Sequence, residues 1–271
     1  MEGFIAFIFG TLFGSFLNVV ILRIPKGESI VFGCSHCTSC FTPLKPWHNI
    51  PIISWAMLGA KCSFCKEKIS TQYPIIELIS GLLLLILVNK YGISLALFSI
   101  FLSFLMLLAL SMIDFKYKMV PDSLNLLAIF FAIFGAWNIQ GVFINFQNAL
   151  LFAGGFTLLR FALSYILTSS AHRQSQKTIT SWTKNYHTSP FIEAMGEGDI
   201  MVAATIGALL GVPLALVAIF FSAVLALPVM LSLRNRSAEE QRVPYVPFLA
   251  LATFVVYIFD SPILAYIEAN Y

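Results

Sequence analysis

Long apolar runs, separated by short polar segments, are the feature that most limits how this 271-residue chain can fold. A soluble domain carries about 25% charged residues, whereas only 11% of this chain is charged and 59% is hydrophobic. Runs of about 20 apolar residues can cross a bilayer as helices, which satisfy all their backbone polar groups internally. We therefore expect an all-α polytopic membrane protein in a lipid bilayer. The sequence has no basic stripe, so we expect no nucleic-acid partner.

The apolar pattern predicts about eight transmembrane helices, with the N-terminus and the C-terminus outside. No basic residue precedes the first run, so we expect a retained helix rather than a cleaved signal peptide. The run at 201–231 is divided into two spans because Gly211-Val-Pro213 interrupts it. The predicted spans are 3–22, 75–88, 93–113, about 121–137, about 146–168, two within 201–231, and about 246–267.

The placement of basic residues supports this topology. The predicted inner loops hold 14 of the 16 Lys and Arg residues, the bias that cytoplasmic loops show. A single tilted helix over 201–231 would instead place Arg234, Arg236 and Arg242 outside. In the eight-span topology the inner loops are 23–72, 114–118, 169–198 and 232–244.

All five cysteines lie in the polar insert at 24–72, as CSHCTSC (34–40) and CSFC (62–65). Two Cys-x-x-Cys pairs supply the four thiolates of a closed tetrahedral zinc site, and a cytoplasmic location disfavours disulfides. Either Cys34 or Cys40 can pair with Cys37, and ordinary free thiols are the alternative. A structural zinc ion would hold together an insert that is too poor in apolar residues to fold alone.

Two aspartates lie at the ends of apolar runs. Asp114 closes LLALSMID, and Asp199 opens a run directly after Gly196 and Gly198, where backbone or substrate can approach closely. Acids at membrane depth are costly unless they are used or paired, and the predicted topology brings both to the cytoplasmic face. Two close carboxylates share a proton, so one can activate water while the other protonates a peptide carbonyl. The pair is the minimum set for an aspartyl protease, although either residue alone could be a helix cap or a polar helix end.

Six stretches of the chain form a recognisable set: GSFLNVVILRIP (14–25), the paired cysteines, NIPIISW (49–55), ISTQYPIIE (69–77), IDFKYKMVPD (113–122) and GEGD (196–199). In order and spacing they resemble those of bacterial type IV prepilin peptidases, which are GxGD intramembrane aspartyl proteases. The resemblance implies an enzyme of the bacterial inner membrane that removes the basic leader from prepilins or pseudopilins. It also implies N-methylation of the new N-terminus with S-adenosylmethionine, the activity that accompanies the cysteine insert in bifunctional members.

Carried over by position, the catalytic aspartates of the family fall on Asp114 and Asp199, with Gly196 and Gly198 completing the motif. The cysteine tetrad of the family is placed by the distance from Cys40 to the Asn49-Ile-Pro stretch. Its zinc ligands then fall on Cys37, Cys40, Cys62 and Cys65. Cys34 is an addition to the family pattern. We accordingly divide the chain into a first transmembrane helix (1–23), the cytoplasmic zinc-binding insert (24–72) and a transmembrane peptidase core (73–271).

Other functions remain open at the level of sequence. The chain contains no recognisable S-adenosylmethionine motif, so its cofactor-binding residues are unassigned and a peptidase without methyltransferase activity is one alternative. A zinc- or redox-sensing membrane protein without catalysis is another. A proton-coupled transporter is a third, although such proteins often contain internal repeats and none is visible here.

Three further polar residues need partners or roles. Glu77, near the start of the second span, either pairs with a cation or faces the methyl-transfer site, because a buried acid in a membrane is costly. Arg160 lies within the fifth span and needs a carboxylate or a lipid phosphate. Asp122 follows Pro121 and is expected to cap the fourth helix rather than to catalyse.

Overall fold

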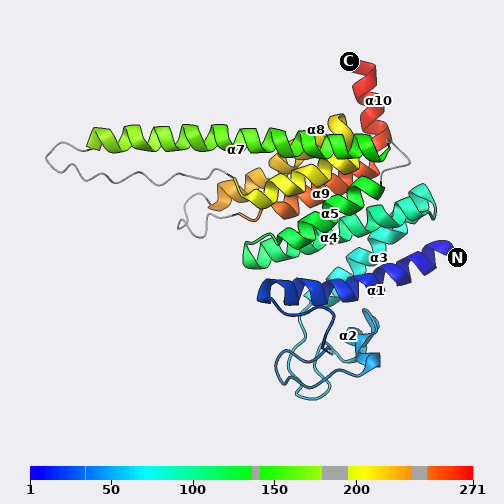
Figure 1. Ribbon diagram of the computed structural model, residues 1–271. Coiled ribbons are helices and arrows are strands. Elements are labelled where there is room, and N and C mark those ends of the chain that lie inside the picture. Colours follow the sequence, from blue (N-terminus) through cyan, green and yellow to red (C-terminus); the bar gives the residue numbers. More distant parts are fainter. Residues whose placement is uncertain (34, 136–140, 179–194, 234–242, 271) are drawn as a thin grey trace.

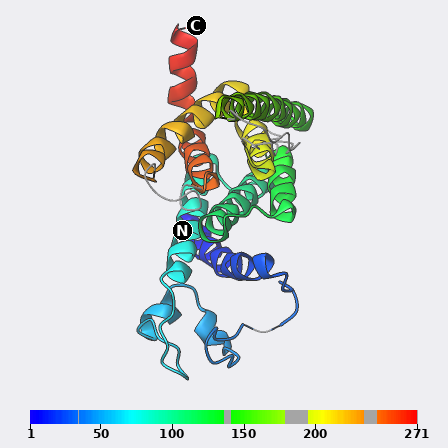
Figure 2. The same cartoon turned by 90° about the vertical axis from the view of Figure 1, so that its left-hand side faces the viewer.

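The computed structural model describes residues 1–33, 35–135, 141–178, 195–233 and 243–270, apart from the side chains of 171–178. Within these ranges every regular element is a helix, as expected, and the helices form an elongated bundle (Figures 1 and 2). The helices are α1 (Glu2–Arg23), α2 (Ile53–Met57), α3 (Gln72–Tyr91), α4 (Leu95–Tyr117), α5 (Asp122–Gly135), α7 (Val142–Thr178), α8 (Glu197–Leu233), α9 (Val246–Ile258) and α10 (Asp260–Asn270).

In the described ranges, five helices are long and apolar enough to cross a membrane, and a sixth span results if the bent pair of α9 and α10 is counted as one. The predicted spans at 3–22, 75–88 and 93–113 correspond to α1, α3 and α4. The predicted span at about 121–137 corresponds to the shorter helix α5. An all-helical fold with several helices able to cross a membrane is therefore confirmed, while the total of eight spans and the position of both termini outside stay predictions.

Helix α8 is kinked at the interruption that the sequence predicted. Gly211 leaves the helical conformation, with φ 72° and ψ 174°, so the 37-residue helix consists of two halves. A positive φ of this kind is accessible to glycine at little cost. In Figure 1 both ends of α8 lie toward the end of the bundle at which α4 ends and α9 begins. If each half of α8 crosses the membrane separately, as predicted, its two ends must lie on the same side, as they do in Figure 1.

The two helices that flank the insert, α1 and α3, pack closely against each other. A Cβ atom added to Gly14 would lie 2.7 Å from the Cα of Glu77, so only glycine allows this approach. Small residues at helix–helix contacts are typical of membrane bundles, where close backbone packing replaces the hydrophobic effect. The insert lies between the end of α1 and the start of α3, below the bundle in Figure 1.

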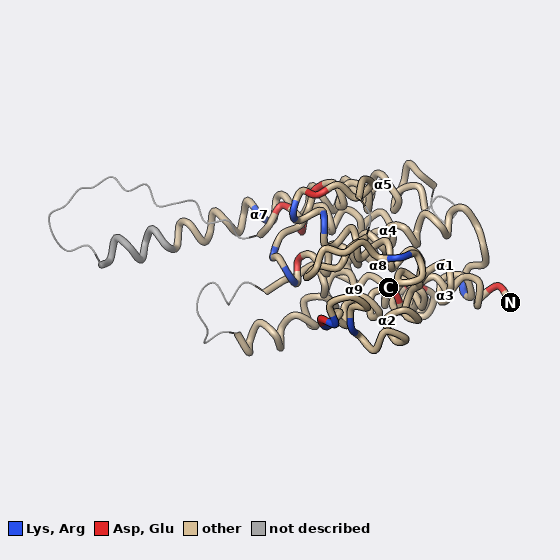
Figure 3. The backbone as a smooth tube through the Cα atoms, turned by 90° about the horizontal axis from the view of Figure 1, so that it is seen from below, with Lys and Arg blue, Asp and Glu red and all other residues tan. Residues whose placement is uncertain are grey.

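Helix α4 is the central element of the bundle and packs against α1, α3, α5 and α9. It buries large side chains such as Phe101, which has no exposed surface. Two of its serines bind carbonyl oxygens of α5: Ser103 donates to Ala128 at 2.9 Å, and Ser99 donates to Phe131 at 2.8 Å. Figure 3 shows most of the described Lys and Arg residues toward the end of the bundle at which α1 and α4 end.

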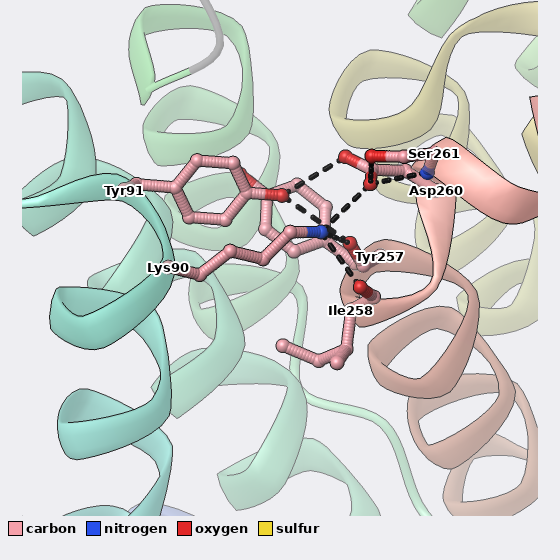
Figure 4. A network of polar contacts seen from close by, with 6 residues as sticks. All are labelled: Lys90, Tyr91, Tyr257, Ile258, Asp260 and Ser261. Carbon is pink, nitrogen blue, oxygen red and sulfur yellow. Dashed lines mark hydrogen bonds and ion pairs between the residues drawn. The ribbon is translucent and has the colours of Figure 1, made fainter.

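A polar network fixes the opposite end of the bundle (Figure 4). The ammonium group of Lys90, near the end of α3, lies 2.7 Å from Asp260 and also donates to the carbonyl oxygens of Tyr257 and Ile258. The hydroxyl of Tyr91 donates to the same Asp260 carboxylate at 3.0 Å. These contacts hold α3 against the 78° bend between α9 and α10.

Candidate functional site

Asp114 lies in the last turn of α4 and is 7% exposed. Its Oδ2 atom accepts a hydrogen bond of 3.1 Å from the backbone N–H of Val246, the first residue of α9. The first N–H groups of a helix have no partners within the helix and are suited to binding a carboxylate. The carboxylate is therefore held at the point where the end of α4 meets the beginning of α9.

Gly198 brings the beginning of α8 against the loop that follows Asp114. After α4 the chain turns at Lys118, which has a left-handed φ of 52°, and then passes through Val120 to α5. A Cβ atom on Gly198 would lie 2.6 Å from the Cβ of Val120, closer than two such atoms can pack. Glycine at this position is therefore what allows α8 to begin here.

Asp199 follows Gly198 on the first turn of α8 and is partly buried. Its carboxylate accepts a hydrogen bond from the backbone of Gly196, and it is close enough to Asp114 for the charge of that residue to act on it. The two predicted aspartates come from helices that are far apart in the chain, and the approach of Gly198 to Val120 sets the first turn of α8 beside the loop that follows Asp114. Their pairing as a catalytic site stays a prediction. Asp122 begins α5 and is exposed, as expected of a helix-terminal residue.

Arg160 of α7 has a carboxylate partner, one of the two alternatives that the sequence left open. Its guanidinium lies 3.0 Å from the carboxylate of Glu197, two residues before Asp199. The arginine side chain is 15% exposed, whereas that of Glu197 is 81% exposed. This ion pair joins α7 to the first turn of α8.

The four predicted zinc ligands form one cluster. The Sγ atoms of Cys37, Cys40, Cys62 and Cys65 all lie within 4.8 Å of one another, and those of Cys37 and Cys65 are 3.9 Å apart. Tetrahedral zinc with Zn–S bonds of about 2.3 Å places its sulfur ligands about 3.8 Å apart. The cluster therefore fits this ion in donor type, number and spacing. Cys34 lies outside the described residues.

Each cysteine pair is held by the same turn. In the first pair, the N–H of Cys37 donates to the carbonyl oxygen of Thr42, and the N–H of Phe41 donates to the carbonyl oxygen of Cys37. In the second pair, the N–H of Cys62 donates to the carbonyl oxygen of Glu67, and the N–H of Lys66 donates to the carbonyl oxygen of Cys62. The residue after each second cysteine has a left-handed φ, 56° at Phe41 and 62° at Lys66. Two copies of one local fold thus present their thiols to a common point.

The thiols differ in how readily they ionise without a metal. The hydroxyl of Thr42, which is hydrogen-bonded to Cys40 Sγ at 3.2 Å, lowers the pKa of that thiol to about 6. The backbone of Glu67 favours the Cys65 thiolate, but partial desolvation by the surrounding cluster and hydrogen bonds with the neighbouring thiols outweigh it and raise the Cys65 pKa to about 12. A divalent cation would relieve this competition by stabilising all four thiolates.

Glu77 connects the insert to the membrane helices. It is 6% exposed, and its Oε2 accepts a hydrogen bond of 2.7 Å from the backbone N–H of Ile52. Ile52 has φ 62° and ψ −51°, a conformation that is strained for a β-branched residue and is kept only where surrounding contacts require it. The acid whose role the sequence left open therefore fixes the position of the NIPIISW segment.

Sequence reasoning missed two parts of the site. The donor to Asp114 is a backbone group of Val246, and such a donor has no residue signature; the nearest signal is Pro247, a residue typical of a first helical turn. The second is a cavity of about 640 Å³ between the insert, the ends of α1 and α4 and the start of α3. No motif in the sequence indicated this cavity.

Comparison with known proteins gives two family models that match in succession. One, described as the bacterial peptidase A24 N-terminal domain, matches residues 8–91, which include the cysteine cluster. The other, described as the type IV leader peptidase family, matches residues 100–231, which include Asp114 and Asp199.

Curated relatives align over nearly the whole chain. A prepilin leader peptidase/N-methyltransferase of Neisseria gonorrhoeae is 30% identical over 93% of this chain and 89% of its own length. Proteins of the same name from Stutzerimonas stutzeri and Bacillus subtilis are 31% and 29% identical, over 96% and 97% of this chain and 91% and 96% of their own. No solved structure matches the chain significantly.

Proposed function

This chain belongs to the type IV leader peptidase family, and we propose that it cleaves the basic leader from type IV prepilins or pseudopilins and methylates the new N-terminal amine. A peptidase of this family is a multi-pass membrane protein, in agreement with the apolar helices. We further propose that it resides in the bacterial inner membrane with its site at the cytoplasmic face. The charge distribution supports this orientation, because the predicted inner loops hold 14 of the 16 Lys and Arg residues.

In the proposed reaction Asp114 and Asp199 hydrolyse the peptide bond with an activated water molecule. One carboxylate accepts a proton from water as its oxygen attacks the scissile carbonyl, and the other, in its protonated form, donates to the carbonyl oxygen. The two roles belong to the pair rather than to either residue. The observation that carries this proposal is the contact of Gly198 with Val120, which sets the first turn of α8 beside the loop after Asp114.

The place of the pair suits the substrate. Asp114 is in the last turn of its helix and Asp199 in the first turn of another, so both lie near one edge of the apolar bundle. Water reaches such an edge, while the helices around it keep the local dielectric low. A prepilin has a basic leader in the cytoplasm followed by an apolar helix in the bilayer, and its cleavage point lies where the two meet.

We propose that Cys37, Cys40, Cys62 and Cys65 hold one structural zinc ion. All four thiols would serve as ligands, so no coordination position remains for water or substrate, and the ion would stabilise the insert rather than catalyse. The methyl donor would be S-adenosylmethionine. The zinc proposal rests on the cluster of four cysteine sulfur atoms, and the proposal of S-adenosylmethionine rests on the names of the relatives.

Cleavage of a purified prepilin by the detergent-purified protein tests the peptidase. Asp114→Asn and Asp199→Asn keep the size and the hydrogen-bonding capacity of the side chain but remove its proton chemistry, so each is expected to abolish leader loss measured by mass spectrometry. Asp122→Asn is the matched control. Asp122 is exposed and begins α5, the helix that follows Asp114 in the chain, so this variant should cleave prepilin like the unmodified protein. Full cleavage by both site variants would refute the assignment.

Methyl transfer is measured on the same product. The cleaved substrate should gain the mass of one methyl group in the presence of S-adenosylmethionine, at its new N-terminus. Cleavage without methylation would instead support the alternative of a peptidase alone.

A further inference from the structure

We propose that the cavity between the insert and the membrane helices binds S-adenosylmethionine, with Glu77 facing its sulfonium centre. This inference rests on the methyl-transfer part of the proposed function. The cavity has a volume of about 640 Å³, within the range of about 300–1,000 Å³ that is usual for small-molecule sites. It is formed jointly by the insert, the ends of α1 and α4 and the start of α3.

The wall provides the groups that a cationic methyl donor needs. Glu77 brings a buried carboxylate to the cavity, and its hydrogen bond to Ile52 fixes the orientation of the side chain. Trp55 and Tyr73 add aromatic rings, which attract sulfonium and ammonium groups through their π faces. The ring of Trp55 is oriented by its own hydrogen bond to the carbonyl oxygen of Ile69.

The same wall suits the rest of the ligand. Lys68 and Lys116 supply positive charge for the carboxylate of the methionine part. Phe16, Val19 and Leu58 supply apolar surface for the adenine ring. A site with both signs of charge and an apolar surface fits a zwitterionic nucleoside better than it fits a uniformly basic leader peptide.

Three polar atoms in the wall residues have no partner within the described part of the chain. They are Nδ1 of His48, Oγ of Ser63 and Nε2 of Gln72, and all three are buried. Buried polar groups without hydrogen bonds are unfavourable and rare in folded proteins. Their clustering around one cavity is the second observation that points to a ligand, because a bound molecule with several polar groups would satisfy them after a small local adjustment.

The cavity borders the end of α4, the helix that carries Asp114. Its lining includes Lys116 and Tyr117, two and three residues after Asp114 on the last turn of α4. A substrate cut beside Asp114 would therefore release its new N-terminus near the methyl donor. The amine first loses a proton to water; its nitrogen then attacks the methyl carbon, an N–C bond forms, the C–S bond breaks and sulfur keeps the electron pair as the neutral thioether S-adenosylhomocysteine.

Ligand binding tests the role of Glu77 without relying on turnover. Glu77→Gln keeps an oxygen for the Ile52 N–H but removes the negative charge. We expect it to weaken S-adenosylmethionine binding at least tenfold in calorimetry, and to weaken S-adenosylhomocysteine, which lacks the sulfonium charge, by clearly less. An equal loss for both ligands would indicate a merely structural role and would overturn the assignment. Metal content and thermal unfolding of each variant report whether the insert has folded.

A second variant and its control test the cavity itself. Trp55→Leu should weaken binding of both ligands, whereas Trp47→Leu should bind them as the unmodified protein does. Trp47 belongs to the same insert but is 59% exposed and does not line the cavity. Unchanged binding by Trp55→Leu would count against the proposal.

Photochemical crosslinking of tritiated S-adenosylmethionine to the unmodified protein locates the ligand directly. We expect labelled peptides from 15–28, 35–58, 62–77 or 116–117, the ranges that contain the lining residues of the cavity. Label confined to α7, α8 or α9 would place the methyl donor elsewhere and overturn the cavity assignment while leaving methyl transfer intact. A protein that cleaves prepilin but neither binds S-adenosylmethionine nor transfers methyl would refute the methyltransferase function itself, and this inference with it.

Discussion

The backbone N–H of Val246 donates a 3.1 Å hydrogen bond to Oδ2 of Asp114, although the two residues are 132 positions apart in the chain. The bond joins the end of α4 to the beginning of α9 and holds the carboxylate in one orientation. A carboxylate oriented by a fixed donor presents its other oxygen to water or substrate in a reproducible way. Helix α9 is therefore part of the proposed peptidase site without contributing a side chain to it.

Val246→Pro should impair cleavage, because proline has no N–H and cannot donate to Asp114. Proline is tolerated at the first position of a helix, so α9 itself should persist. A hydrogen bond to a charged group contributes about 1.5–3 kcal/mol, which corresponds to roughly a ten- to hundredfold fall in kcat/KM for leader removal. Val246→Ala keeps the N–H and loses only side-chain volume, so it should retain most activity. Equal losses in both variants would show that packing, not the donor, matters here.

Gly198→Ala should be far more damaging to cleavage than Gly196→Ala. A Cβ at position 198 would lie 2.6 Å from the Cβ of Val120, whereas one at position 196 would meet only Oδ2 of Asp199, at an ordinary 3.5 Å. Overpacking costs about 1–3 kcal/mol, so a loss of roughly tenfold or more in kcat/KM is expected for position 198.

A compensating variant tests the cause of that loss. Removing the Cβ of Val120 makes room for the new methyl group, so the double variant Gly198→Ala/Val120→Gly should recover part of the lost activity. No recovery, with Val120→Gly alone being active, would mean that glycine is required for another reason, such as the approach of substrate.

Lys90→Met should destabilise the protein without affecting catalysis. It removes the ion pair with Asp260 and the bonds to two carbonyl oxygens of α9, all at the end of the bundle away from the aspartates. For a partly exposed pair we expect a loss of about 1 kcal/mol, or a fall in Tm of about 2–4 °C. Thermal unfolding in detergent measures the first effect and prepilin cleavage the second. Lowered kcat at unchanged Tm would contradict this division of roles.

The sequence predicted those parts of the protein that depend on residue identity. Asp114 and Asp199 stand out because acids are unfavourable at membrane depth, and the spacing of the cysteines predicts a cluster that the structure forms. The interruption at Gly211 likewise falls where α8 bends. In each case the signal is a side chain, or its absence, at a position that has few physical alternatives.

The parts that escaped prediction depend on contacts between distant segments. Nothing in the sequence around Val246 indicates that its N–H meets Asp114. Arg160 clearly needed a counter-charge, but only the packing of α7 on α8 shows that Glu197 supplies it rather than a lipid. The cavity is also a product of assembly, because its wall comes from the insert and from three helices that meet only in the folded chain.

The cysteine cluster should bind about one zinc ion per chain, more tightly as the pH rises, because zinc binds thiolates and competes with protons for them. The pKa of Cys40 is about 6 and that of Cys65 about 12, so near neutral pH the metal must still displace protons, and raising the pH from 6 to mildly alkaline values should lower the apparent Kd. Proton release on zinc addition and metal analysis at several pH values measure this. Cys62→Ser/Cys65→Ser should lose the ion, while Cys34→Ser should keep it. Loss of zinc in the Cys34 variant, or pH-independent affinity, would show that a different set of ligands holds the metal.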